Sequence, residues 1–501
     1  MRYLTSLLMA LTLLLLLAIS LTGFAQIPDT LWSRTYGESS TDYIDAVIQT
    51  ADGGFIMAGQ ANYENQFTTG DLWLLRTNAN GDTLWSKIYA TAGIDRGRDV
   101  LQTADGGFMI AGYQTTPDGL DRDAWLLRTN AVGDTLWSKV WGGSSSDELR
   151  SLGETPDGGF ILAGTTRSFG NSGLEGWLIR TNANGDTLWT RTYGGPATDI
   201  LNRVIPTADG GFVAIGQQFD ATSGAYDLWL VRGSANGDTL WTKAYNGPHF
   251  SYSSDYGSDI RATSDGGFFA SGKATGLPNT TNSDAWLLRL NASGDTLWTR
   301  LYGGISLEET AALEITPDGG VLMTGYTFAA GVDIDAFIMR TDANGDSLWT
   351  IPFGGTGNDQ ITDIHRTSDG GYIASGFTSS PDNLDYNGWL IRLAGDNATG
   401  IGENPTPNPQ GFQLFQNYPN PFNPSTQIEF DIAAPGWTEL NIFDIAGRAV
   451  RSLHAGVLTP GHYNLQWDGK DDAGRPVSSG VYFYQFSSGP FSLAKKMMLI
   501  R

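Results

Sequence analysis

The sequence predicts an all-β protein, with a seven-bladed β-propeller closed by its N-terminal strand and a small immunoglobulin-like β-sandwich after it. Three observations predict this fold. Three short motifs recur seven times each, the two ends of the repeat carry complementary part-units, and a Pro-rich segment then ends the period. With 65 glycines and 12 % aromatic residues, the composition suits many short strands joined by tight turns.

The repeat is defined by motifs that keep their order along the chain. TLW or SLW places seven tryptophans between Trp32 and Trp349, at spacings of 51 to 57 residues. The motif DGG begins seven times from Asp52 onwards, and motifs of the type WLLR begin seven times from Trp73 onwards. Units of this length that recur seven times are typical of propellers.

One unit, residues 95–143, shows the expected strands. They are Arg98–Thr103, Phe108–Tyr113, Ala124–Thr129 and Thr135–Trp141. The sequence NAVGD between the last two predicts a hairpin turn, because Asn and Gly tolerate positive φ. Apolar residues occupy both faces of the fourth-strand sequence TLWSKIY, which predicts a neighbouring sheet on each side.

The ends of the repeat predict ring closure. The chain begins the repeat with a lone fourth strand, Thr30–Tyr36, and ends it after a third strand at Arg392. If the first strand completes the last sheet, the ends of the domain at residues 27–393 are joined and an exposed edge is removed. A linear stack of sheets is the alternative, but it does not explain why the two ends match.

The N-terminal residues 1–25 have the pattern of a secretory signal peptide. Arg2 precedes the apolar run Leu7–Leu21, and Gly23 and Ala25 are the small residues expected before a cleavage site. A retained membrane anchor is the alternative, for which the run is short. We expect no membrane span in the mature chain, and a protein that is secreted or attached to the outer cell surface.

Composition excludes several classes of function. The chain has no cysteine, which removes thiol catalysis and cysteine-ligated metals and leaves a large core, rather than disulfides, to hold an exported protein. The formal net charge of −23 disfavours binding to nucleic acid and to anionic lipid.

A second domain follows the repeats. Residues 394–411 are rich in Pro, Gly and Asn and are predicted to be a linker. Residues 412–501 alternate apolar and polar residues between turns, with about seven strands in this short stretch. This pattern predicts an immunoglobulin-like sandwich.

Both parts resemble known families. The hairpin WLLRTNANGDTLW is similar to that of quinoprotein-type propellers, and the whole unit resembles repeats of secreted bacterial and archaeal surface proteins. The motifs LNIFDIAGRAVRSL, WDGKDDAGRPVSSGVYFYQF and KKMMLIR resemble the type A C-terminal sorting domain of the type IX secretion system. They also resemble the immunoglobulin-like domain of the flagellar hook-capping protein.

The second resemblance implies a partner and a signal. Residues 412–501 would be read by an outer-membrane export machine, with Lys495 and Lys496 ahead of the terminal strand as part of the sorting signal. The alternative is an ordinary charged turn before an edge strand.

No catalytic or metal-binding motif stands out. The four histidines, His249, His365, His454 and His462, fit no hydrolase or metal pattern. The segments DANGD and DGKDD resemble fragments of a calcium loop, but Phe353 occupies the twelfth position, where such a loop needs an acidic residue. We therefore predict no catalytic residue, no metal ligand and no cofactor, with calcium left open.

In six of the seven units a carboxylate stands six residues after the aromatic that ends the fourth strand, and these are candidate ligand-binding residues. They are Asp42, Asp95, Asp147, Asp199, Glu308 and Asp359, and the fifth unit has Asp255, also a candidate, and Asp259 in its insertion. In a propeller they would surround the channel mouth. The alternative is that each caps its own turn by accepting nearby N–H groups.

The loops indicate which face binds. Loops after the second and fourth strands share one face and differ between units, whereas the T-x-DGG and NA-x-GD turns of the other face hardly vary. The insertion in the fifth unit adds Phe250, Tyr252 and Tyr256 to the variable face, and aromatic residues beside carboxylates suit sugars or protein partners. Drift in unconstrained loops is the alternative.

These features favour an exported, non-enzymatic protein that binds a glycan or protein ligand on the variable face. Two alternatives stay open: an extracellular propeller enzyme acting on polysaccharide, as a lyase or hydrolase, and a structural surface-layer component.

Overall fold

A computed structural model describes two compact units, Met1–Ala398 and Thr399–Arg501. The described residues of the first are 28–37, 40–63, 70–91, 93–171, 173–247, 254–275, 283–303, 307–329, 333–355, 357–380 and 385–395. Those of the second are 413–415, 417, 419–420, 422–432, 436–444, 448–458, 461–488 and 491–500. The predicted signal peptide, residues 396–411 of the predicted linker, and the candidate residues Phe250 and Tyr252 lie outside these ranges.

The first unit is built from four-stranded antiparallel sheets, numbered here as repeats in chain order. Repeats 1 to 3 are β2 (Thr41–Gln49), β3 (Phe55–Tyr63), β4 (Asp71–Thr77), β5 (Thr83–Tyr89); β6 (Arg96–Gln102), β7 (Phe108–Thr115), β8 (Arg122–Thr129), β9 (Thr135–Trp141); and β10 (Asp147–Glu154), β11 (Phe160–Thr166), β12 (Glu175–Thr181), β13 (Thr187–Tyr193). Repeats 4 and 5 are β14 (Ile200–Pro206), β15 (Phe212–Asp220), β16 (Ala225–Gly233), β17 (Thr239–Tyr245); and β18 (Tyr256–Ala262), β19 (Phe268–Thr275), β20 (Ser283–Leu290), β21 (Thr296–Tyr302). Repeats 6 and 7 are β22 (Leu307–Ile315), β23 (Val321–Ala329), β24 (Asp333–Thr341), β25 (Ser347–Phe353); and β26 (Asp359–Arg366), β27 (Tyr372–Thr378), β28 (Asn387–Leu393) with β1 (Thr30–Tyr36).

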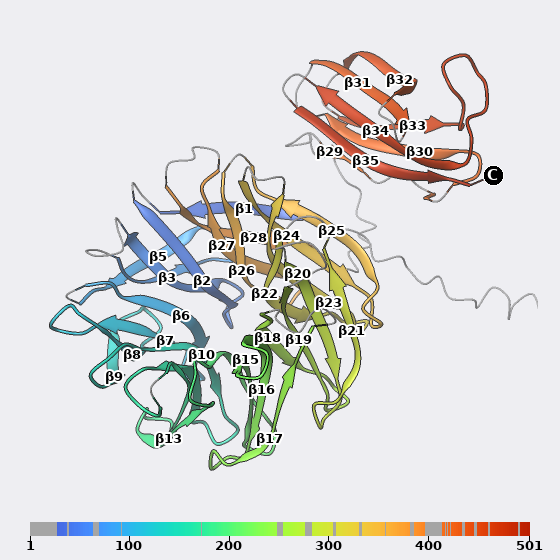
Figure 1. The fold of residues 1–501 in the computed structure, drawn as a ribbon. Coiled ribbons are helices and arrows are strands. Elements are labelled where there is room, and N and C mark those ends of the chain that lie inside the picture. Colours follow the sequence, from blue (N-terminus) through green and yellow to red (C-terminus); the bar gives the residue numbers. More distant parts are fainter. Residues whose placement is uncertain are drawn as a thin grey trace, which may run out of the picture. The chain divides into compact units, whose positions relative to one another are not determined.

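The first strand of each repeat lies innermost. Each of these strands contacts the first strand of the next repeat, from β2 through β6, β10, β14, β18 and β22 to β26, and β26 contacts β2. The sheets radiate outward from these strands (Figure 1). The predicted all-β fold of repeated four-stranded sheets is confirmed.

The N-terminal strand joins the last repeat. β1 pairs antiparallel with β28, with Trp32 opposite Arg392 and Tyr36 opposite Gly388, so the sheet order is β1-β28-β27-β26. The segment Thr30–Tyr36 therefore supplies the fourth strand that repeat 7 lacks in its own sequence.

Each hairpin between third and fourth strands is capped by its first residue. Asn130 Oδ1 accepts the N–H groups of Val132 and Asp134 at 3.0 and 2.8 Å, and Gly133 takes a φ of +80°. The DANGD segment makes the same turn, since Asp342 Oδ1 accepts the N–H groups of Asn344 and Asp346. The repeated NA-x-GD sequence is thus a turn signal.

The motifs DGG and WLLR meet on the same face as these hairpins, in an ion pair between a largely buried arginine and a largely exposed aspartate. In repeat 3 the Arg180 Nη2 donates to Asp157 at 2.5 Å, and Thr155 Oγ1 donates to the same carboxylate at 2.7 Å. Arg180 Nη1 also donates to the Phe160 carbonyl at 3.2 Å. The equivalent pair occurs in every repeat, as Arg76–Asp52, Arg128–Asp105, Arg232–Asp209, Arg289–Asp265, Arg340–Asp318 and Arg392–Asp369. These motifs recur because each one ties a turn to the third strand of its own sheet.

The fourth strands correct one prediction. We expected a neighbouring sheet on both faces, but Leu84 and Ile88 of β5 are 56 % and 42 % exposed. Only the opposite face, with Trp85 tilted against Phe108, packs on the next repeat. Fourth strands are outermost, where radiating sheets diverge, so one face is left to solvent.

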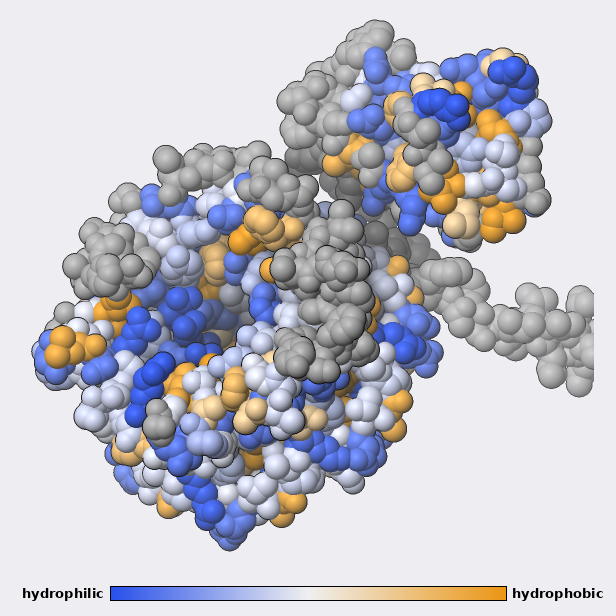
Figure 2. Space-filling view, viewed as in Figure 1, coloured by the Kyte–Doolittle hydropathy of each residue, from blue (hydrophilic) through white to orange (hydrophobic). Residues whose placement is uncertain are grey.

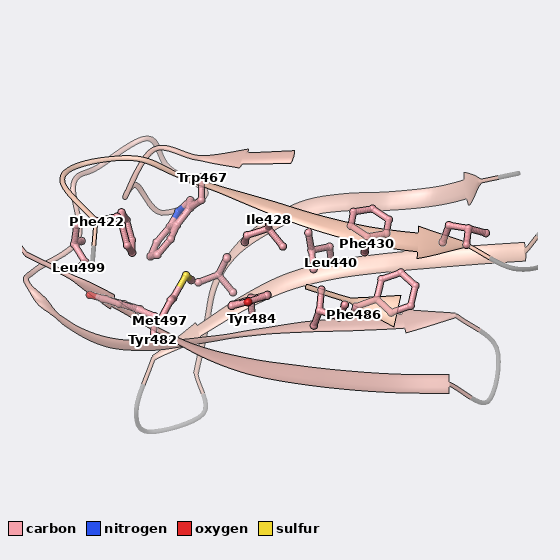
Figure 3. Packing of buried hydrophobic residues seen from close by; sticks show 13 residues of the cluster. Phe422, Ile428, Phe430, Leu440, Trp467, Tyr482, Tyr484, Phe486, Met497 and Leu499 are labelled. Carbon is pink, nitrogen blue, oxygen red and sulfur yellow. The ribbon is translucent and has the colours of Figure 1, made fainter. Parts of the chain in front are cut away.

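The second unit is a two-sheet sandwich. Its sheets have the orders β29-β30-β33 and β32-β31-β34-β35, with strands β29 (Gln413–Leu414), β30 (Thr426–Ile432), β31 (Gly436–Asp444), β32 (Ala449–Leu458), β33 (Gly461–Trp467), β34 (Gly480–Ser488) and β35 (Phe491–Leu499). Trp467, Tyr484 and Phe486 fill the space between them (Figure 3), and all three are fully buried.

Candidate ligand site at the centre of the first unit

The candidate carboxylates Asp42, Asp95, Asp147, Asp199, Asp255, Glu308 and Asp359, called ring carboxylates below, fix the turns that connect successive repeats. Asp199 Oδ2 accepts the N–H of Gly195 at 2.5 Å and its Oδ1 accepts the N–H of Phe219 at 2.8 Å, while its own N–H donates to the Leu174 carbonyl of the preceding repeat. The carboxylate therefore joins the incoming turn to the second strand, and the backbone N–H of the same residue joins both to the preceding repeat.

The same arrangement recurs around the ring. Asp42, Asp95, Asp147 and Asp255 also accept the N–H found twenty residues later, at 2.9 to 3.1 Å. These four carboxylates, Asp199 and Asp359 are all 0 to 2 % exposed. Asp359 Oδ2 accepts from Gly355 N–H and Ser380 Oγ, and Glu308 accepts from Thr327 Oγ1. These hydrogen bonds are those of turn caps, and a role in ligand binding stays a prediction.

A second set of carboxyl groups faces this ring, at the start of the third strands. The pKa values of Asp71, Asp123, Asp227 and Asp335 are raised, first by burial and then by neighbouring carboxylates that include the ring residue of the next repeat. Asp227 is 9 % exposed, its Oδ1 has no hydrogen-bond partner among the described residues, and burial raises its pKa to about 6. The repeats thus meet at paired carboxyl groups.

The innermost strands surround a cavity of about 230 Å³, lined by residues from all seven repeats. Its lining comes from the third and fourth positions after each ring carboxylate: Asp45, Arg98, Arg150, Asn202, Arg203, Ser258, Asp259, Ala311, Ala312, Thr362 and Asp363. In the view of Figure 2, the centre of the first unit is recessed and the surface around the recess is hydrophilic. The repeat pattern breaks here, because these positions carry different residues in different units.

A β-bulge places both positions toward the cavity. In repeat 4, Leu201 pairs with Gly216 and Arg203 with Ile215, so Asn202 has no partner across the sheet. The same register shift occurs in the innermost strand of every repeat. Two successive side chains can then face one side, which a regular strand does not allow.

Charges are distributed unevenly around the cavity. Arg96, Arg98, Arg150 and Arg203 come from the consecutive strands β6, β10 and β14. Asp45, Asp259, Glu314 and Asp363 come from β2, β18, β22 and β26. Asp99, Glu148 and Arg261 interrupt the two groups. The centre of an acidic protein thus has a basic side.

Most of these charges are paired. Asp45 accepts from Arg96 Nε and Nη2 at 2.6 and 2.7 Å and from Arg98 Nη1 at 3.3 Å. Arg150 donates to Asn202 Oδ1 at 2.7 Å and pairs closely with Glu148. Burial opposes ionisation of Glu148, but Arg150 and Arg98 outweigh it and lower its pKa to about 2.

On the acidic side the carboxylates also hold the repeats together. Asp363 accepts the N–H groups of Ile364 at 3.0 Å and of Val47, in repeat 1, at 3.1 Å. His365 Nε2 lies 3.1 Å from Asp363 and its Nδ1 lies 3.9 Å from Glu314. Burial acts against ionisation of Asp363, yet His365 and nearby arginines hold its pKa well below the ordinary value.

Aromatic residues lie at the start of the innermost strands, at the cavity mouth on the variable face. Tyr256, a predicted ligand residue, stacks on Tyr226 with ring centroids 5.8 Å apart, and Lys273 Nζ lies 4.8 Å from its centroid. Tyr43 contacts Phe377 edge-on at 4.9 Å, and Arg96 lies 4.9 Å from the Tyr43 centroid. The mouth combines flat apolar surfaces with charged groups.

The cavity residues were missed because sequence reasoning looked for motifs that recur. Aligning the seven innermost strands on the ring carboxylate shows an apolar residue five positions later in every repeat, whereas positions three and four, which line the cavity, differ from repeat to repeat. That contrast was available in the sequence. His365, placed by the sequence in the first strand of repeat 7, stands at position six, where the other repeats carry Ile, Leu, Gly, Ile, Arg and Glu.

The sorting-signal lysines differ from expectation. Lys495 and Lys496 lie within β35, opposite Tyr484 and Phe483, rather than ahead of the terminal strand. Lys495 is half-buried, and its pKa is lowered by burial. β35 is therefore longer than predicted, because its pairing with β34 runs through both lysines.

Neither a cluster of metal ligands nor a membrane-spanning helix is found in the part of the chain that the structure describes. No group of three or more His, Cys, Asp or Glu residues able to hold a metal ion occurs in the described part of the chain. Within the same ranges, no helix is long and apolar enough to cross a membrane.

Comparisons with known proteins cover both units. A curated relative, "Regulatory protein FlaEY" of Caulobacter vibrioides, is 22 % identical over 399 residues, which are 72 % of this chain but only 37 % of that relative. PorZ of Porphyromonas gingivalis, described as a surface component of the type-IX secretion system, has a TM-score of 0.35 at 12 % identity, covering 90 % of this chain and 68 % of PorZ. The Pan2 WD40 domain of Neurospora crassa has a TM-score of 0.43 at 10 % identity, covering 71 % and 97 %.

One family model matches within the second unit. It is described as the FlgD Ig-like domain and covers residues 423–488, which include most of the strands of the sandwich. The second unit therefore contains an immunoglobulin-like domain similar to that of FlgD.

Proposed function

We propose that this chain is an exported binding protein whose first unit is a seven-bladed β-propeller closed by β1. Its ligand, a glycan or a protein, binds at the variable-face mouth of the central cavity. The observation that carries the proposal is the cavity lining, because it is where the repeats stop resembling one another.

Contacts between repeat 7 and repeat 1 support the closed ring. Tyr36 of β1 donates to the Gly81 carbonyl of repeat 1 at 2.6 Å, and Arg34 pairs with Asp82 at 3.0 Å. Fourth strands elsewhere make the same two contacts with the next repeat, as Tyr193 does to Gly237 at 2.7 Å. The Val47–Asp363 hydrogen bond adds a link beside the cavity.

The mouth supports binding rather than packing alone. Tyr256 and Tyr43 are only partly buried, and each has a cation over or beside its ring. Aromatic faces beside charged and hydrogen-bonding groups fit sugar rings, which offer apolar C–H faces and hydroxyl edges, and also fit protein anchors.

Export and surface attachment rest on the two chain ends. The apolar run before Ala25 supports an exported protein. We propose that residues 412–501 act as a type IX sorting domain recognised by an outer-membrane machine. Their motifs and the FlgD-like domain support this reading.

A binding screen tests the proposal. The chain from residue 26 onward is applied to an array of bacterial and plant glycans and to a panel of surface-protein extracts. We expect retention that is lost on Tyr256→Ala and kept on Leu188→Ser, a change on the exposed outer face of β13. Binding that Leu188→Ser abolishes and Tyr256→Ala leaves intact would place the ligand elsewhere.

A further inference from the structure

The proposed function leaves the ligand class open, and this inference rests on it. The cavity has more hydrogen-bond donors than acceptors left for a ligand. That imbalance follows from how the carboxylates and the arginines are used, which can be followed atom by atom.

The cavity carboxylates are already occupied. Asp99 accepts the N–H of Val100 and of Leu152 in the next repeat, both at 2.9 Å. Asp259 accepts the N–H of Ile260 at 2.8 Å and of Leu313 at 3.0 Å. Asp363 makes the equivalent pair of contacts, and Asp45 is engaged by Arg96 through both oxygens. A ligand that donates hydrogen bonds to these carboxylates would have to compete with the backbone N–H and guanidinium groups that already donate to them.

The arginines have donors to spare. The Arg203 guanidinium lines the cavity, and its nearest carboxylate oxygens are those of Asp259 at 3.5 Å and Asp99 at 3.7 Å. These are ion-pair distances, and among the described residues Arg203 donates no hydrogen bond. Arg98 Nε and Arg261 Nη2 are buried without a partner in the same part of the structure. Buried donors of this kind are costly unless an acceptor arrives.

A carboxylate matches these donors best. Guanidinium groups bind carboxylates through two parallel hydrogen bonds, and this geometry is stronger than a neutral contact. Arg98, Arg150 and Arg203 line the cavity together, and Asn202 and Ser258 add polar groups beside them. The whole-chain charge of −23 does not forbid an anion here, because charges beyond roughly 10 Å are screened at physiological salt.

The size of the cavity and its mouth favour a sugar acid. Pockets for drug-sized ligands run to roughly 300–1,000 Å³, so a cavity of about 230 Å³ admits one small group at a time. The partly buried tyrosines at the mouth offer stacking surfaces to the units that follow. We propose that the cavity binds the carboxylate of a uronic-acid residue through Arg203, with Arg98 and Arg150 beside it, while neighbouring sugars rest on the mouth.

Calorimetry with the chain from residue 26 onward tests the assignment. The probes are galacturonate and glucuronate, their neutral counterparts galactose and glucose, acetate, and a short peptide with a free C-terminal carboxylate. We expect both uronates to bind at least about tenfold tighter than the neutral sugars, acetate and the peptide. This is the factor expected for one charge-assisted hydrogen bond combined with ring contacts.

Variants identify the donor. Arg203→Gln should remove the preference for uronates and Arg203→Lys should keep part of it. Because Arg203 lies at ion-pair distance from the buried Asp99 and Asp259, Arg203→Gln should also lower the midpoint of thermal unfolding, whereas Arg203→Lys keeps the charge. Binding is therefore measured well below the unfolding midpoint of each variant. Arg98→Gln provides a second change in the cavity. The control is Arg300→Gln, on the outer strand β21, which should leave binding unchanged.

Three results would overturn the inference. They are equal affinity for uronates and neutral sugars, an unchanged preference in both cavity variants, and acetate or the peptide binding as tightly as a uronate. Neutral sugars that bind in a Tyr256-dependent way would reject the carboxylate assignment and leave the proposed function standing.

Discussion

At the scale of single residues, carboxyl groups of the same type meet opposite environments in neighbouring repeats. Asp157 is mostly exposed, and hydrogen bonds from Thr155 and Arg180 lower its pKa to about 2. Asp227 is buried beside Asp255, and its pKa is raised to about 6. Asp157 belongs to the DGG motif, so its environment can be predicted from the sequence. The raised pKa of Asp227 comes first from burial and then from Asp220 and from Asp255 of the next repeat, none of which the sequence alone reveals.

Asp227→Asn should stabilise the protein near neutral pH. Because burial raises the folded-state pKa to about 6, against roughly 3.9 unfolded, the wild-type residue stabilises the fold at low pH and loses that contribution as the pH rises through 6. Above pH 7 we expect the variant to gain about 1 to 2 kcal/mol in the free energy of unfolding.

Urea unfolding at pH 5 and pH 7.5 measures this difference. The difference in the free energy of unfolding between Asp227→Asn and wild type should narrow at the lower pH, whereas the control Glu154→Gln, at the exposed end of β10, should have the same small effect at both pH values. A gap that is independent of pH would mean that Asp227 is ionised equally in both states.

At the scale of elements, the bulged innermost strand explains a glycine that recurs in every second strand. A Cβ at Gly216 would lie 1.9 Å from the Ile200 carbonyl oxygen, and Gly112, Gly164 and Gly376 meet the equivalent oxygen at the same distance. The bulge and the glycine therefore occur together. The sequence showed the glycine and the strand, but not the bulge, because a bulge adds no residue type of its own.

Gly216→Ala should therefore be strongly destabilising. The added methyl group collides with backbone, which cannot move without breaking the sheet, so we expect a loss of about 3 kcal/mol in the free energy of unfolding. Gly195→Ala is the matched control, since a Cβ there meets only Asp199 Oδ2 at 3.9 Å. Equal losses in the two variants, measured by urea unfolding, would contradict the steric account.

Strand prediction succeeded where a local signal existed. The predicted Thr135–Trp141 strand is observed with those bounds, whereas the first strand of that repeat begins at Arg96 rather than Arg98. The prediction that fourth strands are covered on both faces was wrong, because apolar residues on both faces do not reveal that a strand is outermost.

The set of cavity-lining residues was missed because it comes from seven separate strands. The set becomes visible only when the repeats are compared position by position.

At the scale of the whole molecule, the proposed closure depends on the seven residues Thr30–Tyr36 of β1. β1 covers the edge of β28 and contacts repeat 1 through Tyr36 and Arg34. Repeat 7 thus combines β1 with β26, β27 and β28. It cannot be complete until the chain has been synthesised as far as β28.

Deleting residues up to Tyr36 should expose the edge of β28 and disturb repeats 7 and 1 together. We expect a lower midpoint of thermal unfolding, faster amide exchange in β26–β28, and self-association seen by size-exclusion chromatography, since exposed edges pair with other chains. Deleting only residues up to Gln26 is the control. Unchanged exchange in β26–β28 would show that β1 is dispensable.

The bulge in the innermost strands has a consequence for how such a protein can diversify. It gives each repeat two neighbouring positions that face the cavity, and these differ between repeats while the residue that follows them is apolar in all seven. Substitutions at the two positions can therefore change the polar groups around the cavity one repeat at a time without altering the apolar residues that pack between the sheets. Under the proposed function, related chains with the same turns and different residues at these positions should bind different ligands.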